Sequence, residues 1–285
     1  MTIREPSLPP GWYPKNAGAI SRFLESWKTR DGTTRDGLAA LAPHAGWYYS
    51  GATAAAAFAS LDGGAETLVI LGGHLAAASP AFVAVEDAVR TPLGLMEIDR
   101  ELRDALCSAL TADSRVWLPD TCQDNTVEVL VPMARFFFPR ARLAALRLPA
   151  DSSSYRTGRM LAEAAGALGR KIAVVGSTDL THYGRNYGFN PRGEGKGALA
   201  WVREVNDRRF IEAVLSGDPA AVLNRAEGER SACSAGAALG VLGFVQNQDP
   251  RPAPVPELLA YATSAGADGG GVPDSFVGYA AIGWN

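Results

Sequence analysis

Three histidines, His44, His74 and His182, are the only ones among the 285 residues of the chain, and each stands in a similar setting. His44 directly follows the apolar run LAALAP, His74 directly follows LVILGG, and His182 comes five residues after IAVVGS. An imidazole can ligate a transition metal or transfer a proton near neutral pH. Three matching positions favour such chemistry over three unrelated hydrogen-bonding roles in turns.

A fourth residue, Cys233, could complete a metal site. Two imidazoles and an anionic ligand can hold a transition metal and leave coordination positions open, as non-haem iron needs for binding substrate and oxygen together. Cys233 in ERSACSAGAALG lies at the start of a predicted helix, where the helix dipole stabilises a thiolate. A small buried core cysteine is the alternative. Cys107, in mid-helix, and Cys122, in a polar loop, receive no role.

Other patterns point more weakly to function. Ser177, Asp179 and His182 could form a hydrolase triad, but residues so close in one loop rarely align for it, and the sequence has no GxSxG elbow. The phosphate-loop-like GEGKGA at 193–198 follows no predicted strand. Four aromatic residues flank two of the histidines and are expected in the core or along the wall of a substrate pocket: Trp47, Tyr48, Tyr49 and Tyr183.

The elements that must position these residues alternate between helical and strand-like patterns. Helices are predicted at 19–30, at 50–61 with Ser50 as N-cap, at 99–110 capped by Asp99, and near 125–138, 154–168, 197–215 and 231–246. Strands are predicted at 37–43, 67–73, 142–148, 171–177, 257–264 and 275–284, with a hairpin around Thr91–Gly94.

This β-α-β-α order predicts an α/β fold, with a central largely parallel or mixed sheet and helices on both faces. An additional antiparallel edge is compatible with the two strand-like segments near the C-terminus. No linker divides the chain, so residues 1–285 are expected to form one domain. Loops leaving parallel strands meet at the carboxyl edge of such a sheet, where ligands bind. The three histidines are therefore expected to lie close together.

Composition excludes several classes of protein. The chain has 27 basic and 30 acidic residues and a formal net charge of −3, so no nucleic-acid partner is indicated. Three cysteines without close spacing indicate a reducing compartment, and the cytoplasm is the expected location. No secretory signal is visible at the N-terminus. The apolar stretch 38–61 contains Pro43, His44 and Ser50, which argues against a membrane span.

Seven motifs, taken together, cover nearly the whole chain and resemble those of one family. They are GWYP (11–14), APHAGWYYSG (42–51), ILGGH (70–74), TPLGLMEID (91–99), DNTVEVLVP (124–132), STDLTHYG (177–184) and ACSAG (232–236). Their order and spacing are similar to those of the Memo family, whose bacterial members are also called AmmeMemoRadiSam system protein B. The second and sixth motifs together are the most specific.

The resemblance implies a fold like that of the class III extradiol dioxygenases, which use non-haem Fe(II). It also implies a metal pocket made by His44, His74 and Cys233, with His182 as acid/base and Asp179 as the acidic residue before it. The chain departs from the family pattern in two places. It has Gly72-Gly73-His74-Leu75 where the family commonly has G-P-[SN]-H, and Asp124-Asn125-Thr126-Val127-Glu128 where the family has E-H-S-x-E.

Residues and resemblance together predict a metal-dependent oxidoreductase that acts on a small substrate, for which an aromatic ring is one candidate, with dioxygen. Fe(II) is the expected metal and copper the alternative. In this scheme His182, oriented by Asp179, moves the substrate proton. The competing prediction is a non-enzymatic protein that binds a peptide or small ligand in the same cleft. The family name also implies a functional link to a radical-SAM protein.

Overall fold

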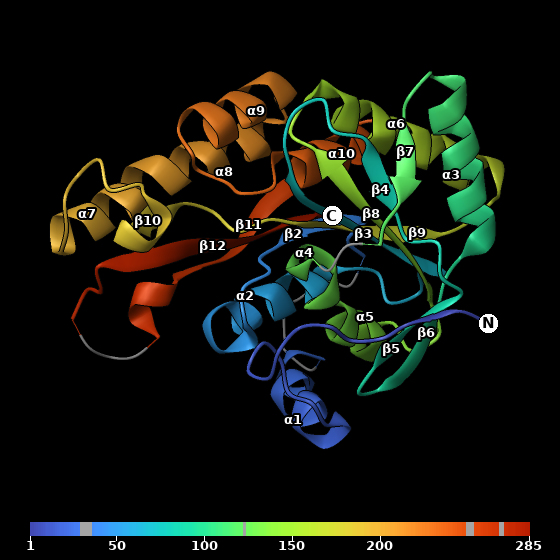
Figure 1. The fold of residues 1–285 in the computed structure, drawn as a ribbon, viewed down its shortest axis with the longest axis horizontal. Coiled ribbons are helices and arrows are strands. Elements are labelled where there is room, and N and C mark those ends of the chain that lie inside the picture. The colour runs from blue at the N-terminus through green and yellow to red at the C-terminus, as the bar shows by residue number, and fades with distance from the viewer. Residues whose placement is uncertain (29–35, 122–123, 249–253, 268–270) are drawn as a thin grey trace.

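The computed structural model describes residues 1–28, 36–121, 124–248, 254–267 and 271–285, and it is built around a nine-stranded mixed sheet (Figure 1). The strand order is β10-β12-β2-β9-β3-β8-β4-β7, and β11 pairs with β12. The four neighbours β2, β9, β3 and β8 are mutually parallel, and antiparallel strands flank them on both sides. The predicted α/β fold with a mixed sheet is confirmed.

The strands of this sheet are β2 (Ala39–Ala42), β3 (Thr67–Leu75), β4 (Ala81–Val83), β7 (Trp117–Pro119), β8 (Arg142–Pro149), β9 (Ile172–Ser177), β10 (His182–Gly184), β11 (Pro256–Thr263) and β12 (Ser275–Trp284). A second, three-stranded sheet consists of β1 (Ile3–Arg4), β5 (Ala88–Thr91) and β6 (Gly94–Glu97). The predicted hairpin is the β5–β6 pair, in which Thr91 lies opposite Gly94. The short strands β1, β4, β7 and β10 were not predicted.

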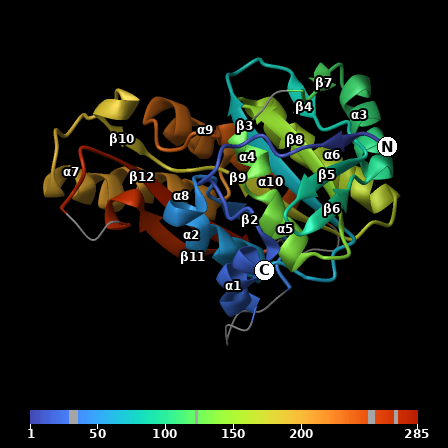
Figure 2. The ribbon, with the colours of Figure 1, turned by 60° about the horizontal axis from the view of Figure 1, so that its bottom comes forward.

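Helices cover both faces of the large sheet, as Figures 1 and 2 show. One layer contains α3 (Arg100–Ala112), α6 (Ser152–Ala167), α8 (Asp207–Ser216), α9 (Pro219–Gly228) and α10 (Ala235–Val245). The other contains α1 (Ala17–Lys28), α2 (Trp47–Ser60), α4 (Asn125–Glu128) and α5 (Val131–Phe137). Of the helices in the described ranges, none combines the length and the apolar character that a membrane span requires.

The two layers enclose two separate hydrophobic clusters, because side chains alternate across a strand. In β3, Val69 and Leu71 pack with the α6–α10 side, whereas Leu68 and Ile70 pack with the α2–α5 side. All four side chains are buried. Burial on both faces explains why the central strands read as continuous apolar runs in the sequence.

Several predicted helices differ from those of the structure, and the one expected near 231–246 begins only at Ala235, as α10. Helix α2 begins at Trp47 with Gly46 as N-cap, and Ser50 lies inside it, where its hydroxyl donates to the carbonyl of Ala45 at 3.0 Å. The helix predicted near 125–138 is two helices, α4 and α5, separated at Val129 and Leu130. Pro132, at the second position of α5, cannot donate a backbone hydrogen bond to a continuous helix.

The helix predicted near 197–215 also differs from expectation. It consists of α7 (Lys196–Trp201), a π-helical turn (Val202–Asn206) and α8, in unbroken succession. The π turn places Asn206 and Asp207 beneath the loop that carries His182: Asn206 Nδ2 donates to Thr181 Oγ1 at 2.9 Å, and Asp207 Oδ1 accepts from Thr181 N at 3.0 Å. Such insertions often occur at functional sites.

Candidate metal centre

The loops that follow β2 and β9 bring two predicted site residues together. The strands pair in parallel, with Ala42 opposite Ser177. His44 and Asp179 each lie two residues beyond these partners, and the backbone N–H of His44 donates to Asp179 Oδ1 at 2.7 Å. His74 lies within the last residues of the neighbouring strand β3. The expected convergence of loops at the carboxyl edge of the sheet places these side chains next to one another.

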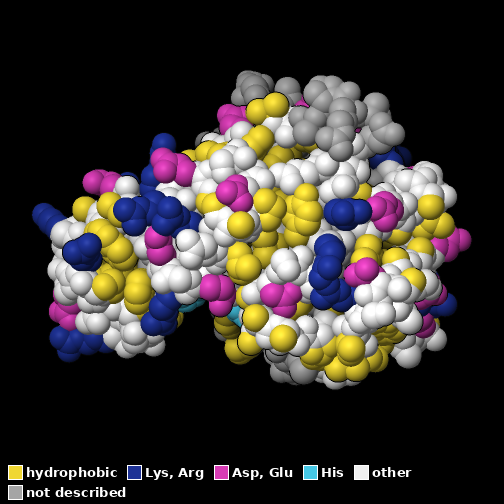
Figure 3. All heavy atoms as spheres, turned by 90° about the horizontal axis from the view of Figure 1, so that it is seen from above, with side chains coloured by type: hydrophobic (Ala, Val, Ile, Leu, Met, Phe, Trp, Pro, Cys, Tyr) yellow, Lys and Arg dark blue, Asp and Glu magenta, His cyan; other side chains and the backbone are white. Residues whose placement is uncertain are grey.

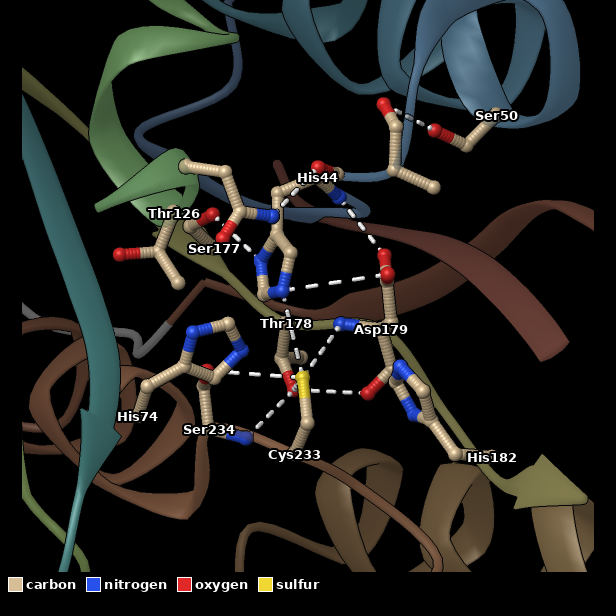
Figure 4. A network of polar contacts seen from close by, with 12 residues as sticks. His44, Ser50, His74, Thr126, Ser177, Thr178, Asp179, His182, Cys233 and Ser234 are labelled. Carbon is tan, nitrogen blue, oxygen red and sulfur yellow. Dashed lines mark hydrogen bonds and ion pairs between the residues drawn. The ribbon is translucent and has the colours of Figure 1, made fainter. Parts of the chain in front are cut away.

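His44, His74 and Cys233 point at one another from three separate segments (Figure 4). Their candidate ligand atoms all lie within 4.8 Å of one another. The His44 and His74 rings meet edge to face with centroids 4.9 Å apart, and Cys233 Sγ lies 3.3 Å from His44 Nε2. The residues singled out in the sequence as metal ligands therefore form one N₂S cluster in the described part of the chain.

A partner on the side of the ring away from the cluster fixes the orientation of His44. Its side chain is buried, and Ser177 Oγ lies 2.9 Å from Nδ1. Nε2 is thereby turned toward Cys233 and toward Asp179 Oδ2, which is 3.8 Å away. Ser177 is fully buried and so cannot meet a substrate as the nucleophile of a hydrolase triad. It acts instead as the partner that orients this imidazole.

A series of ion pairs holds the His74 ring in place. Its Nδ1 lies 3.3 Å from Asp124 Oδ2, and the same carboxylate oxygen lies 3.6 Å from Arg147 Nη1. Arg147 is in turn paired with Asp120 at 2.8 Å. A carboxylate behind a metal-ligating histidine fixes the tautomer and raises the basicity of the ligand. The sequence signal for Asp124 was its place in a family motif, but its contact with His74 was not predicted.

The backbone around His74 is adapted to its crowded position. His74 adopts a left-handed φ of 61°, which is uncommon for a residue with a side chain. The two preceding glycines are required by close packing, since a Cβ on Gly72 would clash with Thr126 and one on Gly73 would clash with Ser234. The Gly-Gly pair therefore lets β3 pass between α4 and the segment before α10, where Cys233 lies.

Charges at the site favour a thiolate at Cys233. Burial alone would raise the pKa of this thiol, but the positive charge of His44 and hydrogen bonds from His44 and His74 hold it well below its usual range. The backbone N–H of Asp179 also donates to Sγ at 3.3 Å. Helix α10 starts at Ala235 with Ser234 as N-cap, so Cys233 lies one residue before the cap. The anionic sulfur suits a metal ligand.

The same buried charges also shift the pKa values of His44, His74 and Asp179. Burial would lower the pKa of His44, but Asp179 and the Cys233 thiolate outweigh it and the net shift is upward. The pKa of His74 rises to about 10, since Asp124 and Cys233 stabilise its charged form against the opposing effect of burial. Burial raises the pKa of Asp179. A cation at the cluster would replace the protons that the two imidazoles otherwise hold.

Cys233 should be the more reactive of the two described cysteines. Cys107 is buried in α3, and burial raises the pKa of its thiol to about 11. In metal-free native protein, iodoacetamide should therefore modify Cys233 first, as followed by peptide mass spectrometry, and metal should protect it. Faster labelling of Cys107, with Cys233 inert, would contradict its assignment as a thiolate. Cys122 lies outside the described residues.

His182 stands apart from the cluster, at the first position of β10. Its Nδ1 lies 3.1 Å from the Leu180 carbonyl, and its ring meets Tyr187 edge to face with centroids 4.9 Å apart. Asp179 makes its hydrogen bond and ion pair with His44, and no hydrogen bond joins it to His182 within the described residues. Among the described residues Asp179 is therefore hydrogen-bonded to His44 and interacts with His182 through charge alone, while the Leu180 carbonyl and Tyr187 lie against the His182 ring.

All three histidines open onto one cleft of about 550 Å³. Figure 3 shows histidine side chains at the hollow between the smaller part of the molecule, which carries α7, and the larger part. The aromatic wall includes Tyr49, as expected, and also Trp12, Tyr187 and Tyr279, which the sequence did not indicate as pocket residues. Trp47 and Tyr183 are core residues with 5% and 1% exposure, and Tyr48 is exposed.

Glu128 holds the N-terminal segment that closes one side of this cleft. Its carboxylate accepts hydrogen bonds from the backbone N–H groups of Ser7 and Leu8 and from the hydroxyl of Tyr13, each at 2.9 Å. The segment between these anchors contributes Trp12 and its neighbours to the cleft. The glutamate that the sequence retains from the family motif therefore shapes the pocket wall.

Replacing Asp124 by Asn should weaken metal binding without abolishing it. The amide keeps the size of the side chain but removes the negative charge that supports His74. Loss of such a partner typically lowers metal affinity by about 10- to 100-fold. Titration with Fe(II) without oxygen would measure the change. Asp62→Asn is a matched control, because its partner Lys171 is far from the cluster in the fold and exposed. Equal affinities in Asp124→Asn and wild type would contradict the supporting role.

Comparison with known proteins identifies the family of this chain. The family described as Memo-like protein matches residues 4–283. A MEMO1 family protein from Pyrococcus abyssi is 32% identical, covering 98% of both chains. One from Methanosarcina barkeri is 28% identical, covering 98% of this chain and 99% of the other. An uncharacterized Escherichia coli protein of known structure aligns with 12% identity and a TM-score of 0.44, over 76% of this chain and 86% of that one. The chain belongs to the Memo-like protein family.

Proposed function

We propose that this chain is a metal-dependent oxidoreductase that acts on a small molecule with dioxygen, with non-haem iron as the metal and copper as the alternative. The observation that supports the proposal is the convergence of His44, His74 and Cys233, whose ligand atoms lie within 4.8 Å of one another, at a cleft that His44 and His74 line. Two imidazoles and one thiolate are donors that suit both metals.

The residues around the cluster fit a cation. His44 Nε2 lies 3.3 Å from the Cys233 sulfur. Each imidazole also has a partner at its other nitrogen, Ser177 for His44 and Asp124 for His74. This is how proteins orient histidine ligands. A bound iron or copper ion would supply the redox chemistry and open positions for substrate and oxygen.

The protein's own residues would handle the substrate and its proton. His182 lies on the cleft wall outside the N₂S cluster, where its Nε2, without a hydrogen-bond partner among the described residues, can take a proton from a substrate hydroxyl and return it to a product. Asn125, whose amide donates to the His44 carbonyl at 3.1 Å, adds a polar group to the cleft lining.

Elemental analysis of protein loaded with Fe(II) or Cu without oxygen, followed by measurement of oxygen uptake with candidate substrates, tests the proposal. We expect about one metal ion per chain and oxygen consumption that depends on both metal and substrate. Stoichiometric metal without oxygen uptake would favour the alternative, a non-enzymatic protein that binds its ligand in this cleft. Absence of metal binding would reject the proposal.

A further inference from the structure

A buried carboxylate supports the loop that carries His182. Asp207, at the start of α8, is fully buried, and its Oδ1 accepts hydrogen bonds from the backbone N–H of Thr181 at 3.0 Å and from the Thr181 hydroxyl. Its Oδ2 accepts from the Tyr261 hydroxyl at 2.7 Å. No cation is paired with Asp207 in the described part of the chain. Because a buried carboxylate without a cation lowers stability, packing alone does not account for this side chain.

The groups around Thr181 fix its backbone on several sides. Leu180 N donates to the Gly278 carbonyl at 2.8 Å, and Gly278 N donates to the Thr181 carbonyl at 3.0 Å. A Cβ at position 278 would overlap the Asp207 carboxylate, so glycine is required for this close approach. Asn206 Nδ2 donates to Thr181 Oγ1 at 2.9 Å. The N–H, the carbonyl and the hydroxyl of Thr181 are therefore all hydrogen-bonded.

A single peptide group connects Asp207 to His182. The peptide between Leu180 and Thr181 donates its N–H to Asp207, and its carbonyl oxygen, that of Leu180, lies 3.1 Å from His182 Nδ1. The N–H and C=O of a trans peptide point in opposite directions within one rigid plane. The hydrogen bond to Asp207 therefore also fixes the direction of the carbonyl that contacts the imidazole.

This carbonyl determines which nitrogen of the His182 ring carries the hydrogen. A carbonyl oxygen only accepts, so Nδ1 must be the donor in this hydrogen bond. In the neutral ring Nε2 is then the basic nitrogen. His182 lines the cleft, and its Nε2 has no hydrogen-bond partner among the described residues. An unconstrained neutral histidine in water favours the opposite tautomer, with the hydrogen on Nε2.

Resting on the proposed function, we propose that Asp207 is a positioning residue that sets the tautomer of the acid/base His182. By holding the N–H of the Leu180–Thr181 peptide, it directs the carbonyl of that peptide at Nδ1 and leaves Nε2 to take the substrate proton. Burial raises the pKa of Asp207 to about 7, against the opposing effect of its hydrogen bonds. Protonation of Oδ2 leaves Oδ1 as an acceptor, so both forms of the acid can hold the peptide.

Nitrogen-15 spectra of metal-free protein labelled at histidine test this inference without turnover. At mildly alkaline pH, where the ring is neutral, the shifts of its two nitrogens distinguish the tautomers, and His182→Gln identifies the signals by their absence. Wild type should show the Nδ1–H form. Asp207→Leu fills a similar space without an acceptor and should shift His182 toward the Nε2–H form, with the signals of the other two histidines unchanged. Asp207→Ala is the second variant should the leucine variant not fold.

Two matched variants keep the acceptor for the peptide. The amide oxygen of Asp207→Asn can accept from Thr181 N while its NH₂ donates to Tyr261, and Tyr261→Phe leaves the Oδ1 contacts in place. Both should retain the wild-type tautomer. After iron loading, Asp207→Leu should keep its metal but lower kcat by about 100-fold, the effect of misplacing a catalytic group by about 1 Å. Asp207→Asn should restore turnover.

The outcomes distinguish this inference from the proposed function. If wild type takes up no metal, the proposed function is rejected, but the spectra of metal-free protein still decide the role of Asp207. An Nε2–H tautomer of His182 in wild type would overturn the inference, as would an Nδ1–H tautomer that persists in Asp207→Leu. If Asp207→Asn behaves like Asp207→Leu, the charge and not the hydrogen bond to the peptide sets the tautomer, and the inference is again wrong.

Discussion

Replacing His44 by Ala should abolish metal binding and oxygen-dependent activity together. His44 is the most enclosed ligand candidate, with 1% exposure, and its Nε2 faces both the thiolate of Cys233 and the carboxylate of Asp179. The variant loses one of three donors and leaves two buried negative groups without their neighbouring cation. With only one nitrogen and one sulfur left, the cluster has too few protein donors to hold Fe(II), the metal expected here.

Metal content after loading without oxygen, measured by mass spectrometry, gives the direct readout for His44→Ala, and oxygen uptake gives the second. Ser177→Ala is an informative companion. It removes only the hydroxyl behind Nδ1 and should weaken metal binding by about 10- to 100-fold while leaving the three donors in place. Wild-type metal content in His44→Ala would show that the cluster is not the metal site.

His182→Gln should separate catalysis from metal binding. The imidazole lies outside the N₂S cluster and is held by the Leu180 carbonyl and the Tyr187 ring, so its removal takes no donor from the metal. Glutamine keeps a polar side chain of similar length but cannot accept and return a proton near neutral pH. Turnover should fall by about 100- to 10,000-fold, the usual contribution of a general acid/base, with metal content nearly unchanged.

Steady-state oxygen uptake beside metal analysis measures both effects on one preparation, and His44→Ala serves as the reference for lost metal. If His182→Gln loses its metal as completely as His44→Ala does, His182 is a ligand and the role given to Cys233 is wrong. If it retains full turnover with the substrate, the acid/base role of His182 is excluded.

The sequence carried enough information to predict the sheet and the meeting of the histidines. Continuous apolar runs identified β2, β3, β8 and β9, and the rule that ligands gather at the carboxyl edge of parallel strands brought His44 and His74 together. The position of Cys233 close to a helix start was also predicted, although the helix expected near 231–246 begins only at Ala235. The local sequence pattern was sufficient to predict strands whose two faces both pack against apolar side chains.

What the sequence could not show are contacts between distant segments. Asp124 reaches His74 across 50 residues of chain, and Ser177 reaches His44 across 133. Neither pairing has a local signature, since both depend on how loops approach after the sheet has formed. The left-handed φ of His74 and the walls formed by Trp12 and Tyr279 arise in the same way. The division between α4 and α5 was missed because apolar periodicity continues through the break.

The gathering of every histidine of the chain at one cleft makes the site easy to observe by magnetic resonance. All three imidazoles line the same cavity, so a sample labelled with ¹⁵N only at histidine contains ring signals from this cleft and from nowhere else in the protein. A paramagnetic ion at the N₂S cluster would broaden the signals of His44 and His74 first and those of His182 less. The same property makes a polyhistidine purification tag unsuitable, because it would add competing metal donors and obscure three otherwise unambiguous resonances.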